Sequence, residues 1–369
     1  MSAAYRESIA SGGAVVQKNC WIRRLRITFE SKEDVTNHLA AQDESFIPWL
    51  KNKYPGLEKY GKQNGIRLVI GDNPDENFNI RVSGNKNIGL NQDNGVIQIS
   101  NITYDSIALI IALRLYRVKI EVGYRNNGEL FCVAKGEVSW IQQKVRSKHD
   151  YELYITYASE LVAAWSQSRI NFSLRSGCNV ADMVHWMFIR QGCSPERVLV
   201  SDRLRRLVAT NMLAASGQTT SVISSALGQY SGATADLITH SDASFNNKVI
   251  SITDIGKSRV IKIEPNFIHI ANGNPTVTSN NGLHIQLFPV FNPVPGDILV
   301  VPNRLIDTSS GLTNPDTVTS TFNQQWLNPN GEYIIRRIEY SFENRGSSFL
   351  FNIYALPVNL YRNLSGGGV

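Results

Sequence analysis

Residues that could carry chemistry are present in this chain, but they are dispersed along it. The 369 residues include four cysteines and six histidines. No two cysteines form a Cys-x-x-Cys motif and none has a histidine at metal-ligand spacing, so neither a zinc site nor a disulfide scaffold is indicated. We therefore predict reduced, mostly buried thiols at Cys20, Cys132, Cys178 and Cys193.

Two patterns come closest to a metal site. The loop 71–77, Gly-Asp-Asn-Pro-Asp-Glu-Asn, is rich in oxygen ligands but lacks the spacing and the distal bidentate glutamate of a calcium loop. It favours a polar hairpin tip. His269 and His284 could face each other across adjacent strands and bind a metal, although packed histidines are the more common case. We expect no metal and no cofactor.

The local signatures of common enzymes are missing. The chain has no Gly-x-Ser-x-Gly elbow, no Walker A loop, no strand-borne Gly-x-Gly-x-x-Gly and no His-Glu-x-x-His. A site assembled from distant residues leaves no such trace, so an enzyme with a dispersed site remains a third alternative. The sequence favours a protein that is not an enzyme.

Composition points to a protein with extensive interfaces. Apolar residues make up 42% of the chain and charged residues only 18%, which leaves less surface charge than most soluble monomers carry. The formal net charge is +6, without a long basic tract, so the argument for nucleic acid is weak. The densest basic positions favour solvated or interfacial faces; they are Arg23, Arg24 and Arg26, then Arg203, Arg205 and Arg206.

Segments that target a chain or cross a membrane are not indicated. The first fifteen residues lack a charged start followed by an apolar region, and no apolar stretch approaches the roughly 18 residues of a span. We expect folding in a reducing cytoplasm and no membrane span. The length predicts two or three domains.

Two blocks of the sequence show the period-two alternation of β-strands. In the first block, the turn Asn126-Asn127-Gly128 predicts a hairpin over residues 118–138. In the second block, turns at Asn281-Gly282, Pro295-Gly296 and Asn330-Gly331 predict an antiparallel barrel or sandwich. The alternating runs lie at 25–30, 78–82, 96–99, 118–122 and 130–138, then at 260–263, 267–270, 283–287, 298–301, 333–342 and 349–355.

The segment between the blocks has a different texture. A helix is predicted after Gly177, with Asn179 as its cap and Gly192 at its end. We interpret its Met183, Trp186 and Met187 as core residues rather than as a ligand groove. Residues 208–235 are rich in Ser, Thr, Ala and Gly and indicate a linker, and residues 102–115 predict a loop or short helix.

Several of these segments together resemble the hub proteins of phage tail baseplates. The matching pieces are Val-Lys-Ile-Glu-Val-Gly-Tyr at 118–124, Gly-Glu-Val-Ser-Trp-Ile at 136–141, Leu-Arg-Ser-Gly-Cys-Asn at 174–179 and the stretches 270–275 and 287–297. The resemblance covers about Trp21 to Tyr361 through short, degenerate motifs. It departs from the family in residues 31–62, and no lysozyme or peptidase domain is present.

The resemblance implies a fold and a role. The fold would be mainly β with a mixed α+β middle domain and two tube-type antiparallel β-barrels per chain. A homotrimer would then present six barrels to the hexameric tail tube and a three-fold face to the central spike. The tape-measure protein and DNA would pass through its lumen, with only transient, non-specific DNA contact. Partners would include the tail tube, spike and tape-measure proteins and surrounding wedge proteins, in a virion baseplate assembled in the host cytoplasm.

We divide the chain accordingly. Residues 1–20 would be an arm, 21–140 the first barrel domain, 141–235 the middle domain and 236–361 the second barrel domain, with a tail at 362–369. Residues 236–252 could complete the first barrel. Candidate interface residues are Phe291, Trp326 and Tyr361. The alternative is that the chain is a β-rich adhesin that binds a carbohydrate or receptor. For an adhesin we would expect exposed aromatic residues along a groove.

Overall fold

The structure is a computed structural model of the 369-residue chain. It describes residues 23–31, 52, 57–59, 66–71, 78–87, 93–113, 115–124, 130–147, 150–158, 168–190, 198–200, 205–206, 208–210, 212–219, 221–222, 237–241, 248–252, 259–269, 276–278, 282–302, 305–306 and 330–358.

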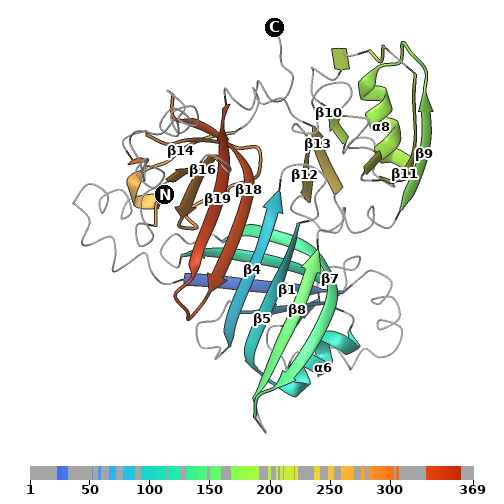
Figure 1. The fold of residues 1–369 in the computed structure, drawn as a ribbon. Helices are drawn as coiled ribbons and strands as arrows, with labels where there is room; N and C mark the ends of the chain where they lie inside the picture. The colour runs from blue at the N-terminus through green and yellow to red at the C-terminus, as the bar shows by residue number, and fades with distance from the viewer. Residues whose placement is uncertain are drawn as a thin grey trace.

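Strands dominate this part of the chain, and fourteen of the described strands form one sheet (Figure 1). Its order is β15-β16-β19-β18-β4-β5-β8-β7-β6-β1-β3-β2, with β17 and β14 added beside β18. The first block supplies β1 (Arg23–Glu30), β2 (Leu57–Lys59), β3 (Ile66–Ile70), β4 (Asn79–Asn87), β5 (Asn94–Ile102), β6 (Arg117–Tyr124), β7 (Phe131–Val145) and β8 (Tyr151–Ala158). A helix, α6 (Tyr104–Ala112), follows β5. The predicted hairpin over 118–138 is confirmed as β6 and β7.

The C-terminal block continues the same sheet. It contains β14 (Val260–Lys262), β15 (Thr276–Thr278), β16 (Gly282–Leu287), β17 (Ile298–Val300), β18 (Glu332–Glu343) and β19 (Phe349–Pro357). The predicted strand at 267–270 is wrong: Pro265–Phe267 is a 3-10 turn and Ile268 makes a single bridge to Leu287. A proline suits the first turn of a helix and has no N–H for a ladder.

The middle part forms two small sheets and a helix. These are β9 (Arg169–Leu174) with β11 (Leu213–Gln218), α8 (Val180–Arg190), and β10 (Val198–Val200) with β13 (Lys248–Ile252) and β12 (Leu237–Ser241). The helix is confirmed, and Asn179 Oδ1 accepts the Ala181 N–H at 2.8 Å. Residues 213–218, for which the sequence indicated a linker, instead pair with β9. The segment proposed to complete the first barrel pairs with β10 as β12 and β13.

A mainly β fold with a mixed middle part is therefore as expected, whereas the join between the blocks was not foreseen. Residues Ile298–Val300 of β17 pair with the first three residues of β18. Beyond a bulge between Ile335 and Arg337, the same side of β18 pairs with β4 over Arg337 to Glu343. One strand thus belongs to both blocks. The two-barrel arrangement and the domain boundaries stay predictions.

A single hydrophobic cluster spans this join. Leu25, Ile27 and Phe29 of β1 are fully buried, as the alternation predicts, and share a cluster with Phe342 and Phe351 of the C-terminal block. The other face of β1 is covered too, because Thr28 and Glu30 are buried and Arg26 is half-buried.

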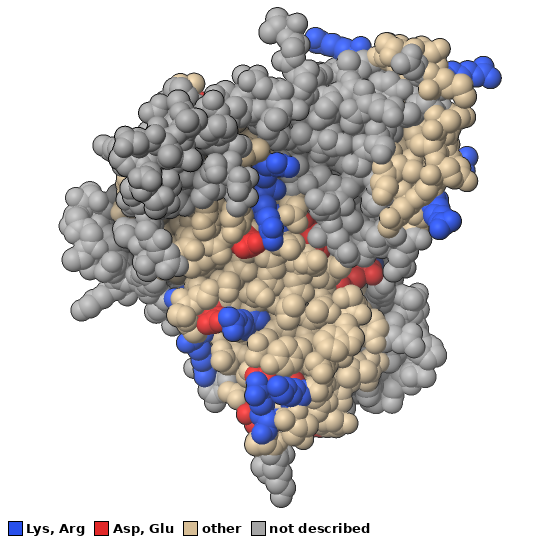
Figure 2. All heavy atoms as spheres, viewed as in Figure 1, with Lys and Arg blue, Asp and Glu red and all other residues tan. Residues whose placement is uncertain are grey.

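Charged groups on that other face lie close to partners of opposite sign. Glu121 accepts from Arg26 at 2.8 Å and from Lys119 at 2.7 Å. Burial raises the pKa of Glu30, and the nearby Arg67 and Lys119 oppose that rise. Figure 2 shows the same arrangement on the visible surface of the sheet, where basic and acidic side chains lie next to each other in small groups.

Two tyrosines meet inside the join. The hydroxyls of Tyr157 on β8 and Tyr340 on β18 form a short, buried hydrogen bond, and burial raises the pKa of both phenols well above the usual value. The space comes from glycines: a Cβ at Gly84 would overlap the Tyr340 hydroxyl, and a Cβ at Gly95 would overlap that of Tyr157. The pair therefore ties the C-terminal block to the first block.

Tyr157→Phe and Tyr340→Phe should each lower the free energy of unfolding by about 1–3 kcal/mol, because each leaves the other buried hydroxyl unpaired. The double Phe variant should cost less than the sum of the two, since it leaves no orphaned hydroxyl. Urea unfolding of the four proteins measures this coupling. Strictly additive losses would show that the two hydroxyls do not depend on each other.

Candidate functional site: a polar pocket and an open strand edge

Of the three candidate interface residues, the structure describes one, Phe291. Phe291 is half-buried, and its ring lies 6.0 Å from that of Phe267, against the core. Trp326 and Tyr361 lie outside the described residues. Their role as interface residues stays a prediction.

The two histidines of the possible metal pair have separate surroundings. The ring of His284 stacks on Tyr354 at 4.7 Å, and His269 Nδ1 lies 3.4 Å from Gln286 Oε1. Burial lowers the pKa of His284. Among the described residues no group of three His, Cys, Asp or Glu side chains is placed to hold a metal ion. Of the loop 71–77, only Gly71 is described.

The described cysteines fit the prediction of reduced thiols. Cys132 and Cys178 are free and half-buried, and the other two lie outside the described residues. Burial raises the pKa of Cys132. Because the thiolate is the nucleophile, this thiol is poorly suited to nucleophilic chemistry.

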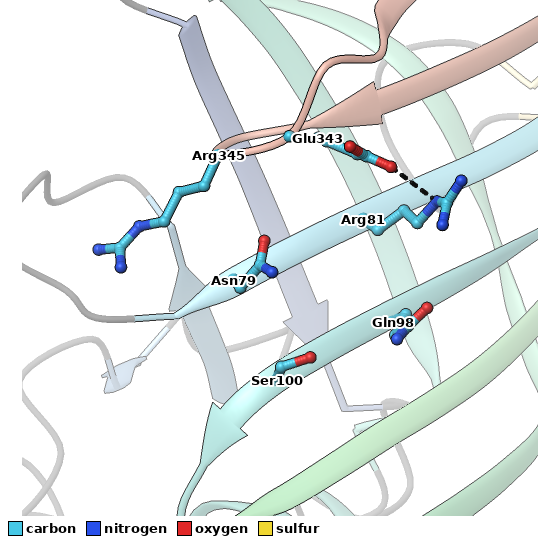
Figure 3. Close-up of a pocket in the computed structure, with 7 residues that line it drawn as sticks. Asn79, Arg81, Gln98, Ser100, Glu343 and Arg345 are labelled. Carbon is cyan, nitrogen blue, oxygen red and sulfur yellow. Dashed lines mark ion pairs between the residues drawn. The ribbon is translucent and has the colours of Figure 1, made fainter.

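One pocket of about 160 Å³ lies on the outer side of the sheet where the two blocks join (Figure 3). Arg81 on β4 and Gln98 and Ser100 on β5 line it, together with the turn after β18. Arg81 Nε lies 2.9 Å from Glu343 Oε1. Figure 3 shows Arg345 extending away from this pair. None of the seven lining residues is aromatic, so the pocket offers no ring on which a sugar could stack.

A buried carboxylate, that of Glu152, accepts hydrogen bonds from two of the residues that line the pocket. Glu152 Oε1 accepts from Gln98 Nε2 at 2.9 Å and from Ser100 Oγ at 3.1 Å. Glu152 Oε2 accepts from Arg146 Nε at 2.6 Å and from the Tyr154 hydroxyl at 2.9 Å. The hydrogen bond from Arg146, followed by those from Tyr154, Gln98 and Ser100, lowers the pKa of Glu152 to about 2.

This network is built to hold strands together rather than to react. The Ser100 hydroxyl donates to a carboxylate with a pKa of about 2, which is too weak a base to activate it at neutral pH. Gln98 and Ser100 belong to β5, and Glu152 belongs to the neighbouring β8. The pocket therefore marks a polar seam between strands.

The turn that closes the pocket is fastened to the first block. Asn344 bonds to the backbone of the first block as a neighbouring strand would. Its Oδ1 accepts from the Ile80 N–H at 2.8 Å, and its Nδ2 donates to the Phe78 carbonyl at 2.9 Å. Its own N–H donates to the Ile80 carbonyl at 3.1 Å. Arg23 on β1 donates to the Gly346 carbonyl and lies over the ring of Phe349 at 5.2 Å. These contacts fix the C-terminal turn against β4 and β1.

The second feature is an open edge on β7. The ladder between β6 and β7 ends at Arg117 and Glu137, but β7 runs on to Val145 with β8 on its other side. From Ser139 to Val145, the side of β7 that faces away from β8 has no strand partner among the described residues. The residues there are Ser-Trp-Ile-Gln-Gln-Lys-Val, with one charge and no proline.

Apolar side chains are exposed around this edge. Trp140 is 52% exposed and Val145 is 62% exposed. Tyr104 at the start of α6 is also exposed, and its ring lies 6.0 Å from that of Tyr151, which pairs with Val145. Natural proteins usually protect a long edge with lysines, proline, a bulge or a covering element. Residues 139–145 carry Lys144 and follow a register shift between Val138 and Trp140, but they contain no proline and have no second strand partner among the described residues. Because Trp140 and Val145 are exposed there, this stretch is a candidate surface for pairing with another chain.

The sequence did not reveal this edge. The alternating run that the sequence shows ends at residue 138, and the edge becomes evident only from the unequal lengths of β6 and β7. The core interpretation of the α8 stripe is right for Met183 and Met187 and wrong for Trp186, which is 41% exposed beneath the Arg190 guanidinium.

No helix among the described residues is both long and apolar enough to span a membrane.

No protein-family model matches the chain, and no curated protein matches it. Solved structures resemble it in fold. A Francisella PdpA–VgrG complex has a TM-score of 0.48 at 11% identity and covers 97% of this chain and 61% of that one. A type VI secretion component of E. coli, described as similar to T4 phage tail proteins gp27 and gp5, has a TM-score of 0.46 at 11% identity, covering 77% and 75%. A Neisseria meningitidis tail protein has a TM-score of 0.45 at 9% identity, covering 79% and 99%.

Glu152→Gln should make the stability of the fold less dependent on pH in the acid range. The pKa of Glu152 is lowered in the folded protein, so its carboxylate stabilises the fold above its ordinary pKa of 4.5. That contribution is lost as the pH falls from about 4.5 to about 2. Thermal unfolding across pH 2–7 measures the slope, and Glu339→Gln on β18 is the control, because Glu339 is more exposed. Equal slopes in wild type and Glu152→Gln would contradict the network.

Proposed function

We propose that this chain is a structural component of a phage-tail or tail-like assembly, and that it acts as the hub of a baseplate. The observation that carries the proposal is the edge of β7 at 139–145, which has exposed Trp140 and Val145 and no second strand partner among the described residues. Such an edge can serve as a template for another strand. The sequence motifs at 118–124, 136–141 and 174–179 name the kind of assembly.

The finer proposal concerns symmetry and partners. A homotrimer would adapt the six-fold tail tube to the three-fold central spike, with the tape-measure protein and DNA passing through its lumen. Its place would be the tail baseplate of a virion, assembled in the host cytoplasm. Heterologous contacts that close into a ring need complementary surfaces on each copy. An open edge supplies one such surface.

The chemistry of the described residues favours a structural over a catalytic role. Glu152, Ser100 and Arg81 are engaged with other side chains across the sheet. The strands that carry them are fused into one body through β18. A rigid body of this kind suits a part whose task is to hold other parts in position.

Native mass spectrometry at micromolar protein should detect a homotrimer. Hydrogen exchange should show that amides of residues 139–145 are protected in the trimer and exchange rapidly in the monomer, because the edge gains a partner strand. A chain that is monomeric at every concentration and does not bind tail tube protein would refute the assembly role. A trimer with unprotected amides at 139–145 would refute only the role of this edge.

Val145→Lys should weaken the assembly by roughly tenfold or more, or about 1.4 kcal/mol, because a lysine on an edge blocks pairing. The matched control is Val260→Lys on β14, where the valine is 56% exposed, against 62% for Val145. Both variants should keep the stability of the monomer, since both side chains are exposed. Equal weakening by the two variants would contradict a specific edge contact.

A further inference from the structure

The middle part of the chain has an excess of arginines over acidic residues, whereas several arginines of the large sheet are paired with glutamates. Residues 168–222 contain seven arginines, no lysine and three acidic residues. Their net charge is therefore +4; Asp236, Asp242 and Lys248 bring the whole middle part, 168–252, to +3, against +6 for the whole chain. The arginines whose placement is described are Arg169, Arg175, Arg190, Arg205 and Arg206, and the one described acid is Asp182.

These arginines are not engaged in ion pairs with described residues, unlike those of the large sheet. Arg26, Arg81 and Arg146 each lie within 2.6–2.9 Å of a glutamate oxygen. In the middle part, Arg190 stacks on the Trp186 ring at 5.2 Å, and Arg169, Arg175, Arg205 and Arg206 are exposed. Guanidinium groups left in this way keep their full capacity for an anionic partner.

The ribbon of β9 and β11 presents part of this charge on one flat face. Ile170 and Phe172 are buried on one side of β9, which leaves Arg169, Asn171 and Ser173 exposed on the other. Across the ribbon, Gln218 is opposite Arg169 and Ser216 is opposite Asn171. Ser216 Oγ donates to Asn171 Oδ1 at 2.5 Å, so the polar face is held in order. We call these five residues the ribbon face.

More arginines gather where β9 leads to α8. The Cys178 N–H donates to the Arg175 carbonyl at 3.4 Å, and Asn179 Nδ2 donates to the Arg205 carbonyl at 2.7 Å. Arg175, Arg205 and Arg206 therefore belong to one end of the ribbon, and Arg169 belongs to the other, about 20 Å away at 3.3 Å per strand residue. Figure 2 shows basic side chains along the outer side of this part.

The side chains of the ribbon face fit phosphate better than they fit a protein. Arginine, serine, asparagine and glutamine are the usual donors to phosphate oxygens of nucleic acids. A protein interface instead has an apolar, often aromatic, centre. All five residues of the ribbon face are polar, and the exposed apolar side chains nearby, Val208 and Met212, lie in the segment between Arg206 and β11. An extended row of donors with arginines at both ends matches a repeating anionic backbone.

We propose that the ribbon face, together with Arg175, Arg205 and Arg206, binds the sugar–phosphate backbone of nucleic acid without reading its sequence. This proposal rests on the proposed function only for the source of the DNA. The binding does not require a trimer, so the two proposals can fail separately.

The test is fluorescence anisotropy of a labelled 30-base-pair duplex of mixed sequence, titrated with the full chain at several salt concentrations. Arg169→Gln combined with Arg175→Gln should weaken binding similarly for duplexes of different sequence. The slope of log affinity against log salt should become shallower by about 2, since each phosphate contact contributes about 0.9. The control is Arg336→Gln combined with Arg337→Gln on β18, which removes the same charge from another surface.

Three outcomes would overturn the proposal. The first is absence of duplex binding at low salt while native mass spectrometry still shows the trimer. The second is an equal loss in the β18 control, which would make the effect one of net charge alone. The third is tighter binding to labelled polyglutamate than to the duplex, with the same dependence on Arg169 and Arg175, which would assign the face to an acidic protein. Unchanged thermal unfolding of both variants shows that they are folded.

Discussion

The pairing of β18 with β4 is the constraint on which the rest of the large sheet depends. A strand of twelve residues has β19 on one side, and on the other side it changes partner from β17 to β4 after one bulge. Because β4 belongs to the first block, the two blocks share one ladder and one hydrophobic cluster. Asn344 and the Tyr157–Tyr340 pair strengthen this join from its two sides. Separating the blocks would expose both the ladder and the cluster, so the large sheet behaves as one mechanical unit.

Local order was predictable from the sequence, and the join was not. Alternation identified β1, β6 and β16, and positive-φ glycines confirm the turns at Gly282, Gly296 and Gly331. These signals depend on residues within one strand or turn. The ladder from Arg337 to Glu343 pairs β18 with residues about 250 positions earlier in the chain. The local sequence of β4 or β18 does not indicate which strand it will pair with. The same limit explains the middle part, where the small residues of β11 suggested a linker but pair with β9.

The candidate surfaces were hidden for a related reason. Trp140 and Ile141 look like any half-buried strand until the length of the neighbouring β6 is known. Trp186 has helical spacing with Met183 and Met187, yet only the methionines are buried. Residues at the border of the apolar face of a helix remain partly exposed, and Trp186 lies at that border. Composition predicted that part of the surface serves contacts, from a charged fraction of 18%, but it does not say where those contacts would lie.

The distribution of charge separates what holds this protein together from what it offers to others. On the large sheet, Glu121 and Glu152 each accept from cationic neighbours and, in the second case, from hydroxyl and amide groups of adjacent strands. Such groups satisfy one another, and little of their charge is left for a partner. Among the described residues, no ion pair joins an arginine of the middle part to an acid. On the proposals made above, the arginines of that part would act on an anionic partner through a long-range field, whereas the β7 edge would act at contact distance through backbone pairing and apolar burial. Contact with an anionic polymer and assembly with other chains would then proceed on separate surfaces, and salt should affect the first far more than the second.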